Sequence, residues 1–185
     1  MTQTADTAAL SVFLHTAIEK KQIHVFLTNR SAQPFQGFVH YSIETNDGRV
    51  RGGMRDEVKA PANSTVQLIF FDRRELDEKR ELLRMELCDE NEKTLQRTFA
   101  QGKGLKPLRL CDPQLQLSAF LRAGQVFVSV RAACFAKDVT LSCDGYTFSE
   151  NGFTLFAGEE KTLALPGAKA DFAGEVTVKS AYDRR

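Results

Sequence analysis

The stretch of sequence that decides the fold reads LSVFLHTAIEKKQIHVFL, over residues 10–27. Apolar residues stand at every second position on both sides of the charged turn Glu19-Lys20-Lys21: Leu10, Val12 and Leu14 before it, and Ile23, Val25 and Leu27 after it. A period of two is typical of a strand with one face in a core and one face in water. The stretch therefore predicts two strands joined as an antiparallel hairpin.

The same alternation predicts five further strands before residue 100. Turn-forming sequences such as Asn46-Asp47-Gly48 and Asp89-Glu90-Asn91-Glu92 separate them. Their apolar positions are Val39, Tyr41 and Ile43; residues 49–58; Val66, Leu68 and Phe70; Leu83, Met85 and Leu87; and residues 94–100. Seven short strands in about 95 residues are typical of an immunoglobulin-like β-sandwich. The Trp and the Cys pair of antibody domains are missing, so the similarity is to the sandwich alone.

One segment of this first half departs from the strand pattern. Charged residues dominate from Asp72 to Arg80, and their spacing would let Glu75 meet Lys79 on one face of a helix. We expect a short solvated helix that crosses between the two sheets.

A polar break at Gln101-Gly102-Lys103-Gly104 predicts a boundary between two domains, 1–104 and 105–185. Beyond it the alternation continues, with turns at Gly124 and at Asp144-Gly145. The apolar positions are Leu115, Leu117 and Ala119; Val126, Val128 and Val130; Val139, Leu141 and Cys143; Leu163 and Leu165; and Val176 and Val178. We therefore expect an all-β chain of two consecutive immunoglobulin-like antiparallel β-sandwich domains, of which the second is smaller.

Composition excludes several classes of partner. The 25 Lys and Arg residues nearly balance the 24 Asp and Glu residues, so no net charge would attract nucleic acid or an acidic membrane surface. No apolar run approaches the roughly 18 residues that span a bilayer. We expect neither a nucleic-acid nor a membrane partner, while the compartment and the oligomeric state cannot be read from this sequence.

The four cysteines lack the close C-x-x-C spacing of zinc or redox motifs, and we interpret them as small apolar core residues. They are Cys88, Cys111, Cys134 and Cys143. Cys88 in particular is expected to be reduced and without a partner cysteine. A disulfide between Cys134 and Cys143, across a hairpin, is left open.

The histidines and the glycosylation sequons also suggest no site. His15, His24 and His40 lie in separate strand patterns with no carboxylate or Cys at ligand spacing, which predicts surface positions on the sheets. Asn29 and Asn63 begin sequons that we interpret as turns. We expect no catalytic, binding or metal-ligating residue and no cofactor.

The carboxylates give no sign of an active site. They fall mainly in turns and in the charged segment, where solvation keeps carboxyl groups ionised near pH 7. These residues are Asp47, Asp72, Glu75, Asp77, Glu78, Asp89, Glu90, Glu92, Asp144, Glu159 and Glu160.

Three stretches, taken in order, resemble the C-terminal end of β-mannosidases of glycoside hydrolase family 2. They are KPLRL at 106–110 followed by Asp112-Pro113, FAKDV at 135–139, and FSENGFTLFAGE at 148–159. The third stretch is the most specific. It departs from the family pattern at Glu150, Gly152, Thr154 and Phe156-Ala157. In it, Ser149 and Asn151 are expected to bond backbone groups and hold an irregular turn, while Phe148, Phe153 and Leu155 enter the core.

The resemblance implies a parent enzyme of five domains, of which this chain matches the last two. The catalytic glutamates of such enzymes lie on a barrel domain, so the resemblance implies a non-catalytic module, with the barrel and the other domains of its own parent as partners. The parent would remove terminal β-mannose from oligosaccharides.

Two alternatives remain open. One is an independent carbohydrate-binding or adhesion module; the other is the same module from a different family 2 β-glycosidase, such as an exo-glucosaminidase. A sugar platform would need exposed aromatic rings, and the chain has no Trp and only three tyrosines, Tyr41, Tyr146 and Tyr182.

Overall fold

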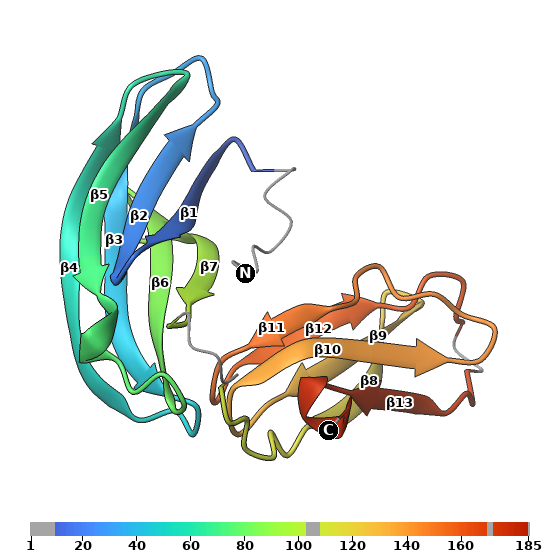
Figure 1. The fold of residues 1–185 in the computed structure, drawn as a ribbon. Helices are drawn as coiled ribbons and strands as arrows, with labels where there is room; N and C mark the ends of the chain where they lie inside the picture. Colours follow the sequence, from blue (N-terminus) through green and yellow to red (C-terminus); the bar gives the residue numbers. More distant parts are fainter. Residues whose placement is uncertain (1–9, 103–107, 170–171, 185) are drawn as a thin grey trace. The chain divides into compact units, whose positions relative to one another are not determined.

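The computed structural model describes residues 10–102, 108–169 and 172–184. Its strands are all antiparallel, and the chain divides into two units (Figure 1). The first unit contains residues 1–45 and 49–109, and the second contains residues 46–48 and 110–185. The all-β class is confirmed. The expected boundary at 104/105 lies outside the described residues and stays a prediction.

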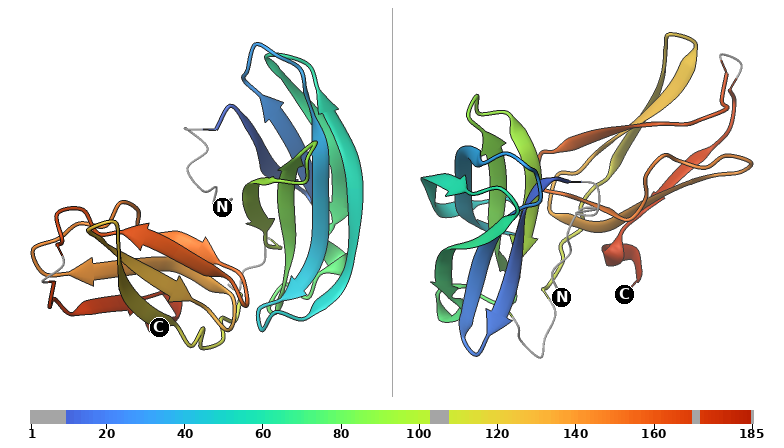
Figure 2. Two further views of the ribbon diagram at one scale, coloured as in Figure 1. Left: turned by 180° about the vertical axis from the view of Figure 1, so that it is seen from behind. Right: turned by 90° about the horizontal axis from the view of Figure 1, so that it is seen from above.

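The first unit is a sandwich of a three-stranded and a four-stranded sheet (Figures 1 and 2). The three-stranded sheet has the order β1-β2-β5, with strands β1 (Val12–Glu19), β2 (Gln22–Asn29) and β5 (Ser64–Asp72). The four-stranded sheet has the order β4-β3-β6-β7, with strands β4 (Val50–Ala60), β3 (Phe35–Thr45), β6 (Glu81–Asp89) and β7 (Thr94–Ala100). All seven expected strands are present.

The core of this sandwich consists of the alternating apolar residues of both sheets. Val25 of β2, Val39 of β3 and Leu87 of β6 are completely buried and belong to one cluster. Asn29, at the end of β2, is also buried, because its side-chain amide donates to the carbonyl oxygens of Gln33, Ala60 and Pro61. The sequence predicted a turn residue here; Asn29 is instead the last residue of β2, and its side chain bonds the turn that follows.

Strand β5 differs from the expected alternation. Ile69 pairs with Val25, but Gln67 pairs with Phe26, so Leu68 is an extra residue in the ladder. An extra residue turns all later side chains to the opposite face. Ile69 therefore packs against the core, whereas Phe70 is 63% exposed. The prediction that Phe70 continues the inward series is wrong.

The expected helix at Asp72–Arg80 is also wrong. Only the 3-10 turn η1 (Arg73–Glu75) forms, with the carboxylate of Asp72 accepting from the backbone N–H of Arg74. The turn ends at Leu76, which has extended backbone and is buried. Arg73 pairs with Glu78 at 2.5 Å. Burial of the Leu76 side chain thus outweighs the spacing of charges that favours a helix. No helix long and apolar enough to cross a membrane occurs among the residues described.

A buried glutamine joins the two sheets at the outer edge of β1, the edge that does not pair with β2. Gln96 of β7 accepts a 2.6 Å hydrogen bond from the backbone N–H of Leu14 and donates a 3.2 Å bond to the carbonyl oxygen of Leu14. Both residues are buried. A buried peptide group without partners costs free energy, so this side chain replaces the missing strand at that point.

We predict that Gln96→Ala lowers the free energy of unfolding by about 1–3 kcal/mol, because it leaves a buried N–H and C=O without partners. Urea unfolding measures the effect. Gln67→Ala, at an exposed position of β5, is the control and should change stability by less than about 0.5 kcal/mol. Equal losses in the two variants would contradict the prediction.

The second unit is a smaller sandwich of two three-stranded sheets (Figures 1 and 2). One sheet has the order β12-β9-β8, with strands β12 (Glu160–Ala164), β9 (Gln125–Arg131) and β8 (Gln116–Arg122). The other has the order β11-β10-β13, with strands β11 (Phe153–Leu155), β10 (Ala136–Cys143) and β13 (Val176–Lys179), and the 3-10 turn η2 (Ala181–Arg184) follows β13. The expected turn before β9 is confirmed: Ala123 and Gly124 both have positive φ, at 50° and 77°, as a two-residue hairpin turn requires.

The core of the second sandwich contains the expected valines of β9 and β10, together with three residues of the FSENGFTLFAGE stretch. Phe148, Phe153 and Leu155 are buried in one cluster, which confirms their predicted role. Strand β8 departs from expectation, because all seven of its residues are exposed. Leu117 is therefore a surface residue.

Asn151 stabilises an edge and not a local turn. Its side-chain oxygen accepts a 2.7 Å bond from the N–H of Leu141, and its amide nitrogen donates a 3.1 Å bond to the carbonyl oxygen of Leu141. Along this side of β10, strand β11 pairs only at Ala136 and Val139. The Asn151 amide continues the ladder for one further residue.

Asn151→Ala should lower the free energy of unfolding by about 1–3 kcal/mol, as measured by thermal or urea unfolding. Ser149→Ala, an exposed position in the same loop, provides the matched control and should have almost no effect. If Asn151→Ala left stability unchanged, the assignment of Asn151 to the edge of β10 would be incorrect.

Candidate functional site

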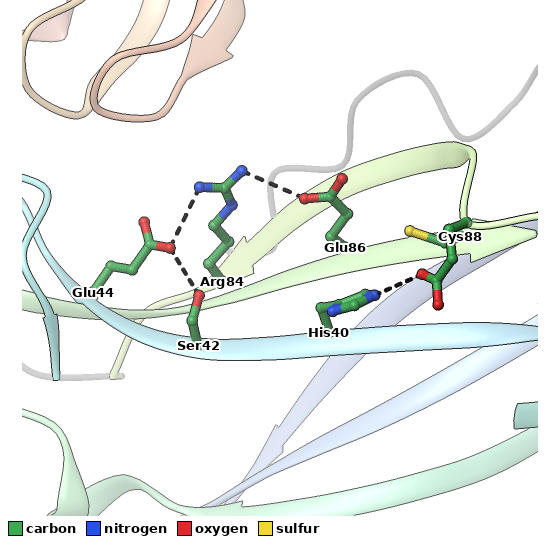
Figure 3. A pocket seen from close by; sticks show the side chains of 7 residues that line it. His40, Ser42, Glu44, Arg84, Glu86 and Cys88 are labelled. Atoms are coloured by element: carbon green, nitrogen blue, oxygen red, sulfur yellow. Dashed lines mark hydrogen bonds and ion pairs between the residues drawn. The ribbon is translucent and has the colours of Figure 1, made fainter. Parts of the chain in front are cut away.

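A polar cavity of about 430 Å³ lies on the face of β3 and β6 that points away from the core. His40, Ser42 and Glu44 alternate on β3, and Arg84, Glu86 and Cys88 alternate on β6 (Figure 3). Glu92, in the turn after β6, completes the lining. The two strands are paired so that His40 lies opposite Glu86 and Ser42 lies opposite Arg84. We refer to these seven residues as the β3–β6 pocket.

A chain of charged hydrogen bonds runs along the β3–β6 pocket. The Glu44 carboxylate accepts from the hydroxyl of Ser42 at 2.8 Å and from Arg84 at 3.3 Å. Arg84 also pairs with Glu86 at 3.5 Å (Figure 3). Glu86 in turn accepts from Thr94 and, at 3.2 Å, from Arg97.

These neighbours control the charge of Glu86. Burial raises the pKa of its carboxyl group, but hydrogen bonds from Thr94 and Arg97 and the positive charges of Arg97 and Arg84 outweigh burial and lower the pKa. The pKa of Glu92 is lowered as well, mainly by its hydrogen bonds from Arg55 and His40. Both groups therefore remain ionised at neutral pH.

His40 lies on the sheet surface, as expected, with its side chain 43% exposed, but a carboxylate and a thiol lie close to it in space. Its Nε2 lies 3.1 Å from Oε2 of Glu92, and the ligand atoms of His40, Cys88 and Glu92 all lie within 4.8 Å of one another. Sequence spacing could not reveal this, because His40 meets Cys88 and Glu92 only when β3 and β6 pair. His15 and His24 bond only neutral side chains in the contacts seen here, those of Thr28 and Gln67.

The cysteines are all free thiols, and Cys88 is buried, as expected. The disulfide between Cys134 and Cys143 that the sequence left open is not present.

Cys134 instead lies beside Cys111. Burial, followed by the hydrogen bond with the Cys134 thiol, raises the pKa of Cys111 to about 11. A 2.8 Å bond from the Ala133 N–H to the carbonyl oxygen of Pro113 holds the two segments together.

The cavity could have been noticed in the sequence as two polar alternations, H-x-S-x-E at 40–44 and R-x-E-x-C at 84–88. Glu44 and Glu86 lie in strands, whereas the carboxylates that the sequence pattern singles out lie in turns and in the charged segment. Each carboxylate of the pocket bonds to an arginine: Glu44 to Arg84, Glu86 to Arg97, and Glu92 to Arg55. Carboxylates paired with arginines are poorly suited to donate a proton in acid catalysis.

Two family models match the chain, one in each sandwich. Residues 21–101 match a Mannosidase Ig/CBM-like domain, and residues 110–184 match an Ig-fold domain of mannosidases. With the antiparallel sandwiches described above, these matches define the class: immunoglobulin-like accessory domains of glycoside hydrolases. More particularly, the chain belongs to the mannosidase type of these domains, with one of each kind in tandem.

Solved structures agree in fold. The β-D-mannosidase from Dictyoglomus thermophilum matches with a TM-score of 0.74 and 18% identity, over 92% of this chain and 22% of that chain. The exo-chitosanase CsxA from Amycolatopsis orientalis matches with a TM-score of 0.64 and 14% identity, over 90% of this chain and 25% of that chain. This chain thus spans a quarter or less of either structure. No curated protein sequence matches it significantly.

Glu86→Gln should destabilise the protein at pH 7 and have progressively less effect in acid. The folded pKa of Glu86 lies below the ordinary value of 4.5, so its stabilising contribution is complete above that value and is lost as the pH falls through the folded pKa. Urea unfolding of both proteins from pH 7 to pH 3 measures the difference. Glu57→Gln, at an exposed position of β4, is the control. A difference that stays constant over this pH range would contradict the assignment.

Proposed function

We propose that this chain is a non-catalytic accessory module of a larger glycoside hydrolase, and that the parent is an exo-acting β-mannosidase that removes terminal β-mannose from oligosaccharides. One observation carries the proposal. Two mannosidase-type domains follow each other in the chain, and the likeness to a β-D-mannosidase extends over 92% of the chain while covering only 22% of that enzyme. On this proposal the catalytic residues lie in parts of the parent that this chain does not contain.

The charges of the β3–β6 pocket support a non-catalytic role. Glycoside hydrolysis generally needs a carboxylic acid that is still protonated at working pH, together with a second, ionised carboxylate. Glu86 and Glu92 have lowered pKa values, so neither can supply a proton to a leaving group near pH 7. Each also binds an arginine, which would compete with a substrate hydroxyl.

The exposed edge strand β8 supports contact with another domain of the parent. Phe120 and Leu121 are 41% and 51% exposed, and Leu117 lies on the same strand. Phe120 stacks on Phe127 of β9, with ring centroids 5.9 Å apart. An edge strand that carries apolar side chains is an association hazard when left uncovered. Burial against a neighbouring domain would remove that hazard.

The alternatives make different demands. An independent carbohydrate-binding module would bind oligosaccharide without a catalytic domain, and the similarity of residues 21–101 to a Mannosidase Ig/CBM-like domain supports this alternative. The second alternative is a parent of the exo-glucosaminidase type, the activity named for CsxA. At 14% and 18% identity both solved structures report on fold alone, so the sugar is part of the proposal.

The isolated chain is expected not to hydrolyse an aryl β-mannoside above the uncatalysed background, measured by release of the aryl group from pH 4 to pH 8. The surrounding coding sequence is expected to encode a catalytic barrel in the same reading frame. Turnover that disappears on replacing one Asp or Glu would overturn the non-catalytic assignment. Binding of mannose oligosaccharides by the chain alone, measured by calorimetry, would favour the independent binding module instead.

A further inference from the structure

Three side chains with different metal-binding chemistry converge at one end of the β3–β6 pocket. The imidazole of His40, the thiol of Cys88 and the carboxylate of Glu92 come from β3, from β6 and from the turn after β6. Their ligand atoms lie within 4.8 Å of one another. Cys88 is 3% exposed but forms part of the cavity wall, beside His40 (Figure 3).

The regular pairing of β3 with β6 and an irregularity in the pairing of β6 with β7 position these side chains. Cys88 pairs with Phe38 and lies diagonally from His40 on the same face of the sheet. The β6–β7 ladder shifts register between Leu87 and Cys88, and such irregularities commonly redirect a side chain. The turn that follows is fixed by Asp89, whose carboxylate accepts the N–H groups of Asn91 and Lys93, each at 2.9 Å.

The Glu92 carboxylate is already oriented for a ligand role. One of its oxygens, Oε1, accepts hydrogen bonds from the guanidinium of Arg55, which itself lies 3.6 Å above the ring of Phe38. The other oxygen, Oε2, faces Nε2 of His40 at 3.1 Å. A metal ion bound to both atoms would lie to one side of the line that joins them and would replace this contact, with Nε2 as the unprotonated nitrogen of the imidazole. Arg55 would then act as an outer-shell group that fixes the carboxylate, although its positive charge reduces the affinity for a cation.

We propose that His40, Cys88 and Glu92 form a binding site for Zn²⁺. Mixed nitrogen, sulfur and oxygen ligands suit this ion, whereas Mg²⁺ and Ca²⁺ prefer oxygen ligands alone. Three protein ligands leave a fourth tetrahedral position open to the cavity for water. On binding, the Cys88 thiol loses its proton to solvent and coordinates as the thiolate.

The electrostatic surroundings of the thiol fit this assignment. Burial, and then the negative charges of Glu86 and Glu92, raise the pKa of Cys88. A bound divalent cation would lower the pKa of Cys88 again, because it stabilises the thiolate directly. The remaining charged neighbours, Arg84 and Arg97, are bound to Glu86, which limits their repulsion of a cation.

Cobalt provides the test, because Co²⁺ occupies zinc sites and reports its ligands by absorption. The purified chain, reduced with a phosphine, is titrated with Co²⁺ and then with Zn²⁺. We expect a thiolate-to-cobalt charge-transfer band and the visible bands of a four-coordinate ion, saturating at one ion per chain and displaced by Zn²⁺. Absence of the charge-transfer band would overturn the proposal.

Variants assign the ligands. Cys88→Ser should abolish the charge-transfer band, and His40→Gln and Glu92→Gln should each weaken binding more than about tenfold. The latter two side chains are substantially exposed, so these variants remain informative if Cys88→Ser proves unstable in thermal unfolding. His24→Gln, on the other sheet, is the matched control and should bind as the unmodified chain does.

The neighbouring thiols Cys111 and Cys134 offer the clearest competing explanation. A band that persists in Cys88→Ser and disappears in Cys111→Ser would place the metal there and overturn the proposal. Unchanged affinity in both His40→Gln and Glu92→Gln would also overturn it, even if the band required Cys88.

Discussion

The structure depends on one constraint: a backbone N–H and C=O that lie in a core must have hydrogen-bond partners even where a neighbouring strand ends. Both sandwiches meet it in the same way. In the first, the Gln96 amide binds the N–H and C=O of Leu14, and in the second the Asn151 amide binds those of Leu141. A side-chain amide has one donor side and one acceptor oxygen, so it can substitute for a peptide group of an absent strand.

The same strand geometry that builds the core also builds the polar pocket. Along β3, Val39 and Tyr41 point inward and are buried, while His40 and Ser42 point to the other face. Because β6 alternates in register with β3, the polar residues of both strands meet on that face. A cluster of ionised groups therefore arises beside a well-packed core, and hydrogen bonds among arginines and glutamates compensate the charges.

The similarity to glycoside hydrolases lies in the fold of each sandwich and in the order of the two domains. Each sandwich matches a mannosidase-type domain, and the FSENGFTLFAGE stretch that suggested the relation serves packing: its apolar residues enter the core and Asn151 secures an edge. The chemistry of the β3–β6 pocket is a separate property, since none of its residues belongs to that stretch.

The sequence by itself determined the all-β class, most strands of both sandwiches and most of their core, because the period of two is a local property that each strand displays independently; the short strand β11 was expected as an irregular turn. It also indicated the relation to mannosidases through three stretches between residues 106 and 159. Tertiary structure decided the rest. The extra residue Leu68 reversed the side of Phe70, burial of Leu76 replaced the expected helix, and pairing of β3 with β6 brought His40 to Cys88 and Glu92. These outcomes depend on register and packing between residues that are distant in sequence, and a local pattern carries no information about such contacts.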